Sequence, residues 1–479
     1  ISRSSAVLPV YKEYERGIAT WLNASLAPIV SRYLSLLRDQ LRGCSLQIMQ
    51  SSGETIAADK ASDLAVNLLL SGPAGGLTAI QFLGRQIGNE KLISFDMGGT
   101  STDVALIDGK INTTIEGQIE RYPIGVPMVD MHTIGAGGGS IAFVDSGGML
   151  KVGPHSAGAD PGPACYAKGG EVATVTDANL VLGRLLVSSA LAGSLTLSLA
   201  KSKSAIKALG EVLGMCIEET ALGIITIANE HMAKAIRLIS VNRGYDPSEF
   251  VLASFGGAGG LHVCSIAEAM QMKQAIVPVY GGVLSALGMT VADRGRQFTR
   301  TVALYAEDGV AKNLEEQFLE LAELGRCELV NEGLSSSKLQ VKYSADCRYR
   351  GQSYTLNIPW SNLQTCCTAF AVLHKQRYGY DLSAGIEIVN IRVNVIAATK
   401  SLSLPLHCSK GEYDKCESIK VYGSSEPAKV FNRDQLQTGT EFEGPAVVSE
   451  YAATIFVAPG WTARVDQYGN LLLSNKTIE

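Results

Sequence analysis

The 479-residue chain lacks several features that mark common classes of protein. It contains no run of Lys and Arg, and its net charge is −5, so we expect no basic surface for nucleic acid. No uninterrupted apolar segment approaches the roughly 20 residues that a membrane-spanning helix needs. Its ten cysteines include no C-x-x-C pair, which is typical of a reducing compartment rather than of a disulfide framework. We therefore expect a cytoplasmic protein that contacts neither nucleic acid nor membrane.

The sequence also begins without Met, at Ile1, and no signal-peptide pattern follows. From this we expect a piece of a longer chain. The composition, with 46% hydrophobic and 18% charged residues, is suited to large folded cores. A chain of this length is too long for one core, and roughly two to four domains are expected.

The most informative stretch lies between two apolar runs and has a carboxylate near each end, at Asp96 and Asp103. Between the carboxylates stand mostly glycines and hydroxyl residues: Gly98, Gly99, Thr100, Ser101 and Thr102. Glycine lets the backbone approach an anion closely, and successive amides and hydroxyls can surround phosphate oxygens. A neighbouring carboxylate typically holds Mg²⁺ or its waters, and we assign the metal to Asp96. The stretch therefore predicts a phosphate loop, with an ordinary hairpin turn as the alternative.

This loop lacks the spacings of the best-known nucleotide-binding motifs. Neither Gly-Lys-Ser/Thr nor G-x-G-x-x-G occurs in it, and the residues that follow predict a strand rather than a helix. Asp108-Gly109 then predicts a hairpin turn into a third short strand. A β-hairpin whose turn binds phosphate is the arrangement of the actin-like ATPases and sugar kinases, so the stretch resembles one of their two phosphate loops.

A second glycine-rich stretch, 135–140, follows Asp130 and His132. These two side chains would share one side of a strand, so they are a candidate metal-binding or acid–base pair, with a structural role as the alternative. Cys165 lies in a segment rich in Pro, Gly and Ala. We interpret it as a small buried residue rather than a nucleophile.

A strongly amphipathic helix over 221–243 places Glu230 and Lys234 on one polar face. In the actin-like architecture such a face often lines the adenine pocket, and a surface row of ion pairs is the alternative. A buried strand, 250–255, then leads into a glycine turn and another helix. We expect four glycines of that turn to contact the nucleoside: Gly256, Gly257, Gly259 and Gly260.

The composition changes near residue 300. We therefore expect an α/β domain over residues 1–300, with a small helical insertion at 194–220. A separate α+β or β-rich domain is expected over 301–479. That second domain shows no catalytic constellation of its own.

Together these pieces resemble the hydantoinase A/oxoprolinase family over nearly the whole chain. The matching stretches are Glu13 to Arg16, Leu70 to Gly76, Asp96 to Asp103, Gly135 to Ser140, Val152 to Tyr166, Thr174 to Asn179, Phe255 to Gly260, Arg348 to Gln352 and Gly444 to Ala446. Two departures stand out. Ser52-Gly53-Glu54-Thr55 replaces the family's usual glycine pair, and only one of the family's two Asp-x-Gly-Gly-Thr loops is found, so an N-terminal lobe would precede Ile1.

The resemblance implies an α/β fold with an actin-like ATPase (ribonuclease H-like) core. It implies ATP-dependent opening of a cyclic amide, such as a hydantoin or 5-oxoproline, through phosphorylation of the lactam carbonyl, with ATP and Mg²⁺ as cofactors. A hydantoinase B-type subunit or domain is the implied partner, in a homo- or hetero-oligomer.

In our working hypothesis Asp96 and Asp103 orient Mg²⁺ or a water, while Asp130 and His132 act on the substrate side. Two alternatives stay open. One is a carbonyl-activating subunit of an acetone-type carboxylase, and the other is a non-catalytic fragment or scaffold.

Overall fold

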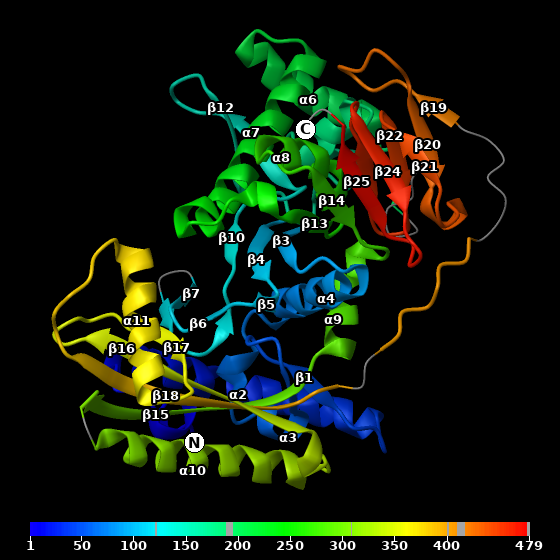
Figure 1. Cartoon of the computed structure of the whole chain (residues 1–479). Helices are drawn as coiled ribbons and strands as arrows, with labels where there is room; N and C mark the ends of the chain where they lie inside the picture. Colours follow the sequence, from blue (N-terminus) through cyan, green and yellow to red (C-terminus); the bar gives the residue numbers. More distant parts are fainter. Residues whose placement is uncertain (120–121, 188–194, 308, 400–401, 410–416, 477–479) are drawn as a thin grey trace. The chain divides into compact units, whose positions relative to one another are not determined.

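We describe the chain from a computed structural model over residues 1–119, 122–187, 195–307, 309–399, 402–409 and 417–476. It forms two compact units: unit 1 contains residues 1–75, 113–129 and 289–401, and unit 2 contains residues 76–112, 130–288 and 402–479. Figure 1 colours the elements of both units along the chain. The two units do not follow the boundary expected at residue 300, because the last segment of the chain belongs to unit 2. Residue 194 of the expected insertion, and 308, 400–401, 410–416 and 477–479 of the expected second domain, lie outside the described residues.

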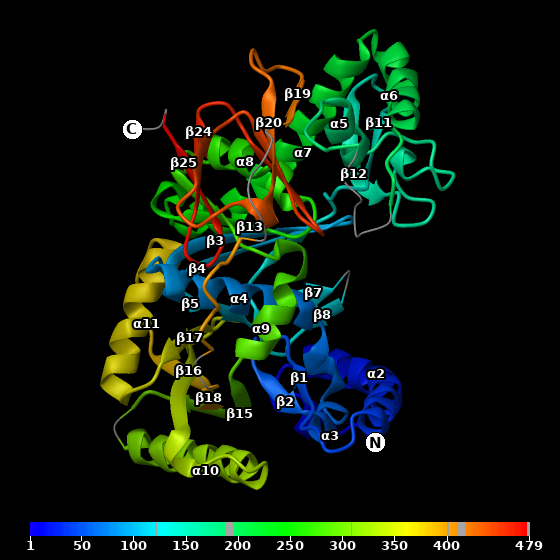
Figure 2. The same ribbon diagram turned by 90° about the vertical axis from the view of Figure 1, so that its right-hand side faces the viewer.

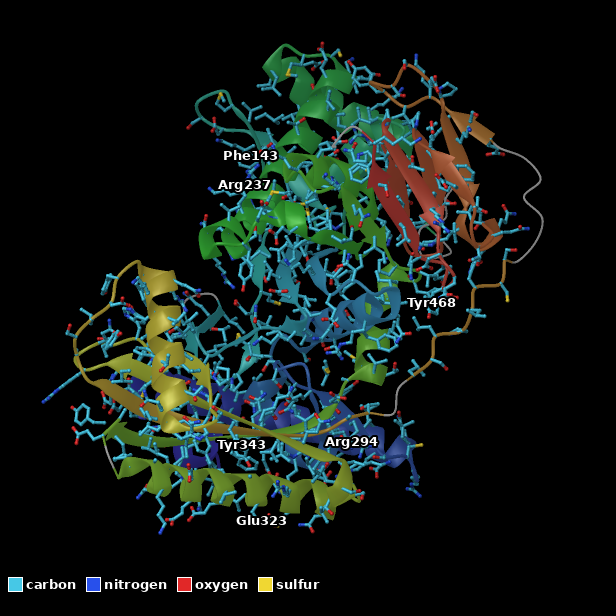
Figure 3. All side chains as sticks on the ribbon, in the orientation of Figure 1. Phe143, Arg237, Arg294, Glu323, Tyr343 and Tyr468 are labelled. Carbon is cyan, nitrogen blue, oxygen red and sulfur yellow. The ribbon has the colours of Figure 1, made fainter. Side chains whose placement is uncertain are left out.

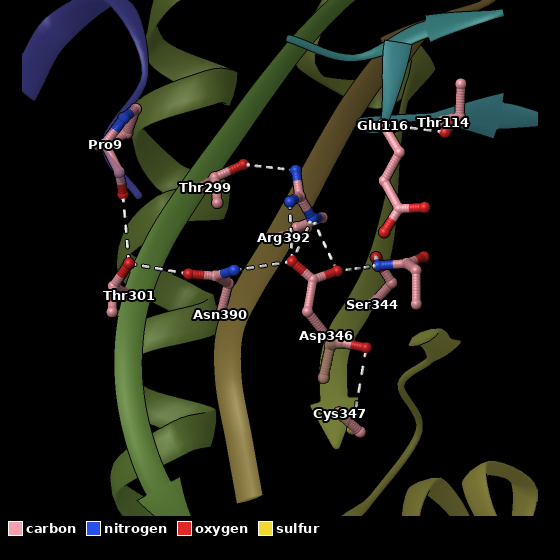
Figure 4. Close-up of polar contacts among 12 residues, drawn as sticks. Pro9, Thr114, Glu116, Thr299, Thr301, Ser344, Asp346, Cys347, Asn390 and Arg392 are labelled. Carbon is pink, nitrogen blue, oxygen red and sulfur yellow. Dashed lines mark hydrogen bonds and ion pairs between the residues drawn. The ribbon is translucent and has the colours of Figure 1, made fainter. Parts of the chain in front are cut away.

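Unit 1 is organised around a six-stranded sheet in the order β1-β2-β15-β18-β16-β17. The strands are β1 Gln47–Met49, β2 Thr55–Ala57, β15 Arg294–Tyr305, β18 Ile386–Ala397, β16 Leu339–Tyr349 and β17 Leu356–Pro359. Alternation along the long strands gives the sheet one apolar face, which packs against α10 (Val310–Asn331) and α11 (Leu363–Tyr378). The opposite face is polar, with Arg392 bonded to Asp346 and Thr299 near its centre (Figure 4).

The N-terminal part of unit 1 is mostly helical. Helix α2 (Glu13–Gln40) is one continuous helix that contains Pro28. Acidic residues in its first turn and Arg38 in its last turn complement the helix dipole. The remaining elements are short: α1 Ser4–Val7, α3 Ala58–Ala61, and the strand pairs β6 Thr113–Thr114 with β9 Met128–Val129 and β7 Gly117–Ile119 with β8 Tyr122–Ile124.

Unit 2 is built on a nine-stranded sheet whose main path is β10-β4-β3-β13-β14-β25-β24-β21. The strands from the expected ATPase part are β10 His132–Ile134, β4 Thr102–Asp108, β5 Lys110–Ile111, β3 Lys91–Met97, β13 Val251–Phe255 and β14 Gln274–Val277. β3 and β4 are antiparallel, as the hairpin pattern predicted, whereas β3, β13 and β14 run parallel. The three parallel strands therefore end at the same edge of the sheet.

The last segment of the chain completes this sheet. β25 (Leu471–Asn475) pairs antiparallel with β14, and β24 (Trp461–Val465) and β21 (Glu441–Glu443) follow it (Figure 1). A four-stranded sheet is formed by β19 Glu417–Ile419, β20 Ala428–Asn432, β22 Ala446–Ser449 and β23 Thr454–Val457. Figure 2 shows β24 and β25 in red near the green helix α8 (Val263–Ala269). Much of the expected C-terminal domain thus shares one core with the expected ATPase part.

Helices of unit 2 pack on the sheet through apolar stripes. The longest is α7 (Ile217–Ile239), whose buried stripe includes Ile224, Met232 and Ile236. α6 (Leu199–Leu213) lies in the expected insertion and packs against α7 and α5 (Val175–Val181). The other elements are the hairpin β11 Ser140–Val144 with β12 Leu150–Ser156, and helices α4 Ser71–Ile87 and α9 Leu284–Val291, which begin or end in unit 1. Within the described residues, no helix combines the length and apolar composition that crossing a bilayer requires.

Candidate active site

The two carboxylates of the central stretch lie opposite each other on neighbouring strands. Asp96 near the end of β3 pairs in register with Asp103 near the start of β4. Phe95 and Met97 beside Asp96, and Thr102 and Val104 beside Asp103, are fully buried. The alternation of the strands therefore turns both carboxylates toward the opposite face. Burial and the negative charge of Asp103 raise the pKa of Asp96 to about 6.

Asp103 has a hydroxyl partner from the adjacent strand. The Oγ1 of Thr133 on β10 donates a hydrogen bond of 2.6 Å to Asp103 Oδ1. Burial nevertheless raises the pKa of Asp103, since it disfavours the charged form. Two carboxylates at this spacing form a concentrated negative site, which a divalent cation would stabilise.

The loop between the carboxylates is a tight turn with an open tip. The N–H of Gly98 donates to the carbonyl of Ser101 at 3.1 Å, while Gly99 and Thr100 are exposed. The hydroxyl of Thr102 is different, because it is fully buried and donates to the carbonyl of Ala136. The backbone N–H groups of the exposed Gly99 and Thr100 can thus meet a ligand, whereas the Thr102 side chain ties the loop to the 135–140 segment.

The 135–140 glycines support the loop by backbone packing. Gly138 and Gly139 donate their N–H groups to the carbonyls of Gly98 and Gly99, at 3.0 and 2.6 Å. A Cβ on Gly137 would lie 2.7 Å from the backbone N of Thr100, which is too close for any side chain. This segment therefore packs directly against the 98–102 loop.

The second glycine turn also reaches the carboxylates. Gly256 has a φ of +79°, and a Cβ there would lie 2.5 Å from Asp96 Oδ1 and 2.4 Å from the carbonyl oxygen of Met97. The N–H of Ala258 donates to that same carbonyl at 3.1 Å. Only glycine fits at Gly256, and its backbone covers one side of the Asp96 carboxylate.

The other predicted glycines of this turn pack against the protein. Gly259 lies against the Ser254 hydroxyl, and Gly260 against the Thr454 carbonyl, with distances of 2.8 Å from the position of a Cβ in each case. Gly257 lies near the carbonyl of Ala452, at 3.3 Å. Their contact with a nucleoside remains a prediction.

The two helix residues expected near the adenine lie on an exposed face. Glu230 and Lys234 on α7 are both exposed, and Glu230 forms a 3.9 Å ion pair with Arg237, which Figure 3 labels. The contact between Glu230 and Arg237 agrees with the alternative interpretation of this face as a surface row of ion pairs. Their role toward a nucleoside remains a prediction.

Asp130 and His132 occupy neighbouring positions, and among the described residues Asp130 is paired with Arg243. Arg243 donates to both carboxylate oxygens of Asp130, with Nη2 at 3.1 Å from Oδ1. His132 lies on β10 opposite Val104 of β4. Among the residues that the structure describes, no group of three or more His, Cys, Asp or Glu side chains is placed to hold a metal.

The sequence did not single out His262, which lies just beyond the glycine turn. It is buried, with Nδ1 2.7 Å from Asn229 Oδ1 and Nε2 3.3 Å from Asn179 Nδ2. Burial and the positive charge of Arg184 lower the pKa of His262 to about 3, so the ring is neutral. In the sequence, the signal that could have pointed to His262 was its position directly after the glycine turn, following Gly260-Leu261.

Cys165 is buried as expected. Burial raises the pKa of its thiol, which makes the thiol unsuited to act as a nucleophile.

Two protein-family models match the chain. A model described as hydantoinase/oxoprolinase matches residues 16–297, which is more than half of the chain. The chain belongs to the hydantoinase/oxoprolinase family. A second model, of the hydantoinase/oxoprolinase C-terminal domain, matches residues 413–476. The resemblance predicted from the motifs is thereby confirmed.

Relatives with named activities agree with this assignment. The chain is 34% identical to the caprolactamase subunit alpha of Pseudomonas jessenii, over 96% of this chain and 70% of that subunit. It is 33% identical to 5-oxoprolinase 1 of Arabidopsis thaliana, over 98% of this chain and 39% of that protein. An uncharacterised protein of Methanocaldococcus jannaschii is 41% identical, over 98% of this chain and 71% of the relative. The named relatives confirm the expected enzyme class.

Solved structures show the same fold. The crystal structure of the ATP-dependent caprolactamase from Pseudomonas jessenii matches with a TM-score of 0.88 and 33% identity, over 98% of this chain and 72% of that one. Nucleotide-free acetone carboxylase matches with a TM-score of 0.78 and 26% identity, over 98% of this chain and 70% of that one. Both confirm the mixed α/β fold.

Proposed function

We propose that the chain takes part in ATP-dependent opening of a cyclic amide, in which the amide carbonyl oxygen is phosphorylated before hydrolysis. The observation that carries the proposal is the Asp96–Asp103 pair beside the open tip of the 98–102 loop. Backbone amides at the tip would surround phosphate oxygens, and the pair supplies the negative charge that a cation needs. The family of the chain and the names of its relatives support the same chemistry.

We also propose that unit 2 contains the expected actin-like, ribonuclease H-like core. The order β10-β4-β3-β13-β14 supports it, with β4 antiparallel to β3 and with β13 and β14 parallel to β3. In this arrangement the phosphate loop is the turn between β3 and β4. The turn after β13 reaches the same edge, which explains why Gly256 lies against Asp96.

The residues present fit ATP with Mg²⁺. Mg²⁺ is usually held by one or two carboxylates together with phosphate oxygens and waters, and the partly buried Asp96 and Asp103 match that donor set. Asp96 would hold the ion, which when bound neutralises charge on the phosphates. The chain itself would orient the nucleotide through the loop amides. Asp130 and His132 stay our candidates for the substrate side.

Partner and substrate follow from the relatives as proposals. One relative is called subunit alpha, which supports an assembly with a second, hydantoinase B-type subunit or domain. The names of these relatives and of the family support lactams as the substrate class, with hydantoins as a further choice.

The test is a substrate panel with the chain and its partner subunit. 5-Oxoproline, hydantoin and caprolactam are supplied with Mg²⁺ and ATP, and both ADP and ring-opened product are measured. We expect ring opening that requires ATP, and Asp96→Asn should abolish it. ATP-independent opening, or full activity in Asp96→Asn, would contradict the proposal.

A carboxylase subunit is the second candidate, and the match to acetone carboxylase favours it. This function also activates a carbonyl group with ATP, so the same loop would serve it. Bicarbonate-dependent ATP consumption with a ketone distinguishes the two candidates. Nucleotide binding without turnover on either substrate class would instead favour the scaffold alternative.

A further inference from the structure

A buried arginine in the last segment of the chain links three parts of unit 2. Arg433 follows β20 and donates from Nη2 to the carbonyl of Val277 at 2.7 Å, where β14 ends. Nε and Nη2 donate to the carbonyl of Gly469, at 3.3 and 3.0 Å. Nη1 lies 3.0 Å from Oε2 of Glu450. Arg433 is 3% exposed and Glu450 9%, so this is a buried ion pair with a fixed geometry.

Glu450 connects this pair to the turn that follows β14. Besides Arg433, its carboxylate accepts the backbone N–H of Gly281. The two turns also touch directly, because a Cβ on Gly282 would lie 2.6 Å from the Cβ of Ala452. A charged acceptor gives the Gly281 amide a stronger hydrogen bond than a neutral one would. The C-terminal segment therefore holds the turn that follows β14 in its position.

The contact continues from this turn to the catalytic pair. The carbonyl of Gly281 accepts the N–H of Gly256 at 3.1 Å. Gly256 in turn lies against Asp96, since a Cβ there would be 2.5 Å from Oδ1. Three successive direct contacts thus join Glu450 to Asp96.

We propose that Glu450 is a positioning residue of the active site, which holds Gly256 against Asp96 through Gly281. Its catalytic consequence rests on the proposed function, whereas the contact series does not. Moving a reacting group by about 1 Å can reduce a rate by about a hundredfold, so a small shift of Gly256 would matter. The proposal gives the C-terminal segment a part in the chemistry, where the sequence showed no catalytic group.

Two double variants separate the hydrogen bond to Gly281 from the ion pair. Both carry Arg433→Met, which removes the charge pair, and a buried pair can often be replaced by apolar groups without loss of the fold. One adds Glu450→Gln, which keeps an acceptor oxygen for Gly281, and the other adds Glu450→Leu, which does not. Both double variants therefore lose the same contacts of Arg433, and they differ only in the acceptor oxygen at position 450.

The first readout is hydrogen exchange of the Gly256 amide in the full chain, which needs no activity. We expect exchange about tenfold faster in the Leu variant than in the Gln variant, the factor expected when a hydrogen bond to a buried acceptor is lost. The second readout is steady-state kinetics with the partner subunit. We expect kcat to fall by roughly tenfold to a hundredfold in the Leu variant only, with the KM for ATP within about twofold.

Equal exchange in the two double variants would overturn the contact series. Faster exchange with an unchanged kcat would overturn the positioning role. An unmodified chain without ATP-dependent activity on any substrate would instead contradict the proposed function, and the exchange comparison would still decide the contact between Glu450 and Gly256.

Discussion

Asp96 and Asp103 lie directly opposite each other on the antiparallel strands β3 and β4, and the backbone of Gly256 covers the Asp96 carboxylate. The pair combines partial burial with like charge, two conditions that raise the pKa of a carboxyl group. A protein keeps such an arrangement at a cost in stability. Perturbed carboxylates of this kind are typical of functional sites.

The first prediction concerns the stability of Asp96→Asn without Mg²⁺. The pKa of Asp96 is about 6 in the folded chain against an ordinary value of 3.8, so the folded state binds the proton more tightly. Stability is therefore lost as the pH rises from about 4 to about 6, by on the order of 3 kcal/mol. We expect Asp96→Asn to be more stable than the wild type at pH 8, with the difference shrinking below pH 5. Chemical denaturation in EDTA measures this difference in stability. A difference that does not change with pH would contradict the raised pKa of Asp96.

His262 should make the chain sensitive to acid. Its pKa is about 3 in the folded chain against 6.5 ordinarily, so the unfolded chain takes up a proton first as the pH falls. Its stabilising contribution is complete above pH 6.5 and declines below it by about 1.4 kcal/mol per pH unit. We expect His262→Gln to be less stable at pH 8 but to lose less between pH 6.5 and 4.5. If the free energies of unfolding of the two proteins fell by the same amount across that pH range, the prediction would be contradicted.

Gly137→Ala should damage the 98–102 loop, the proposed phosphate site. The added Cβ would lie 2.7 Å from the backbone N of Thr100, so the loop or its support must move. We expect a destabilisation of about 1–3 kcal/mol and weaker nucleotide binding by calorimetry. Gly17→Ala on α2 is the control, because a Cβ there meets nothing within 4 Å. Unchanged binding by Gly137→Ala would show that the loop tip is not the nucleotide site.

Two ion pairs should differ sharply in their contribution to stability. Asp346 is buried and bonds Arg392 on the polar face of the unit 1 sheet, whereas Arg243, the partner of Asp130, is exposed. Asp346→Asn leaves the largely buried guanidinium of Arg392, which is 14% exposed, without its countercharge, and we expect a loss of about 3–5 kcal/mol. Asp130→Asn should lose about 1 kcal/mol or less. Urea unfolding measures both, and equal losses would contradict the burial argument.

The sequence predicted those parts of the site that depend on local signals. The two apolar runs on either side of the glycine and hydroxyl residues predicted the β3–β4 hairpin, and Asp108-Gly109 predicted the following turn from β4 into β5. The strand, glycine turn and helix around Gly256 were likewise predicted from residues that are neighbours in the sequence. The buried stripe of α7 followed from its helical period.

Contacts between distant segments could not be predicted in this way. No local pattern indicates that β25 pairs with β14, or that the C-terminal segment joins the unit that contains the 98–102 loop. The same holds for Gly137, whose role depends on backbone packing against Gly99. No local pattern marked Glu450, because its burial beside Arg433 arises from this long-range assembly.

The most direct test of the central claim is the rate of ATP-dependent ring opening in Asp96→Asn. The chain and its partner subunit are assayed with the lactam that the wild type accepts, and Glu323→Gln on the exposed face of α10 is the control. We predict that Asp96→Asn lowers the rate by roughly a hundredfold or more while Glu323→Gln leaves it unchanged. An Asp96→Asn rate within about twofold of the wild type would contradict the assignment of this loop as the phosphate site.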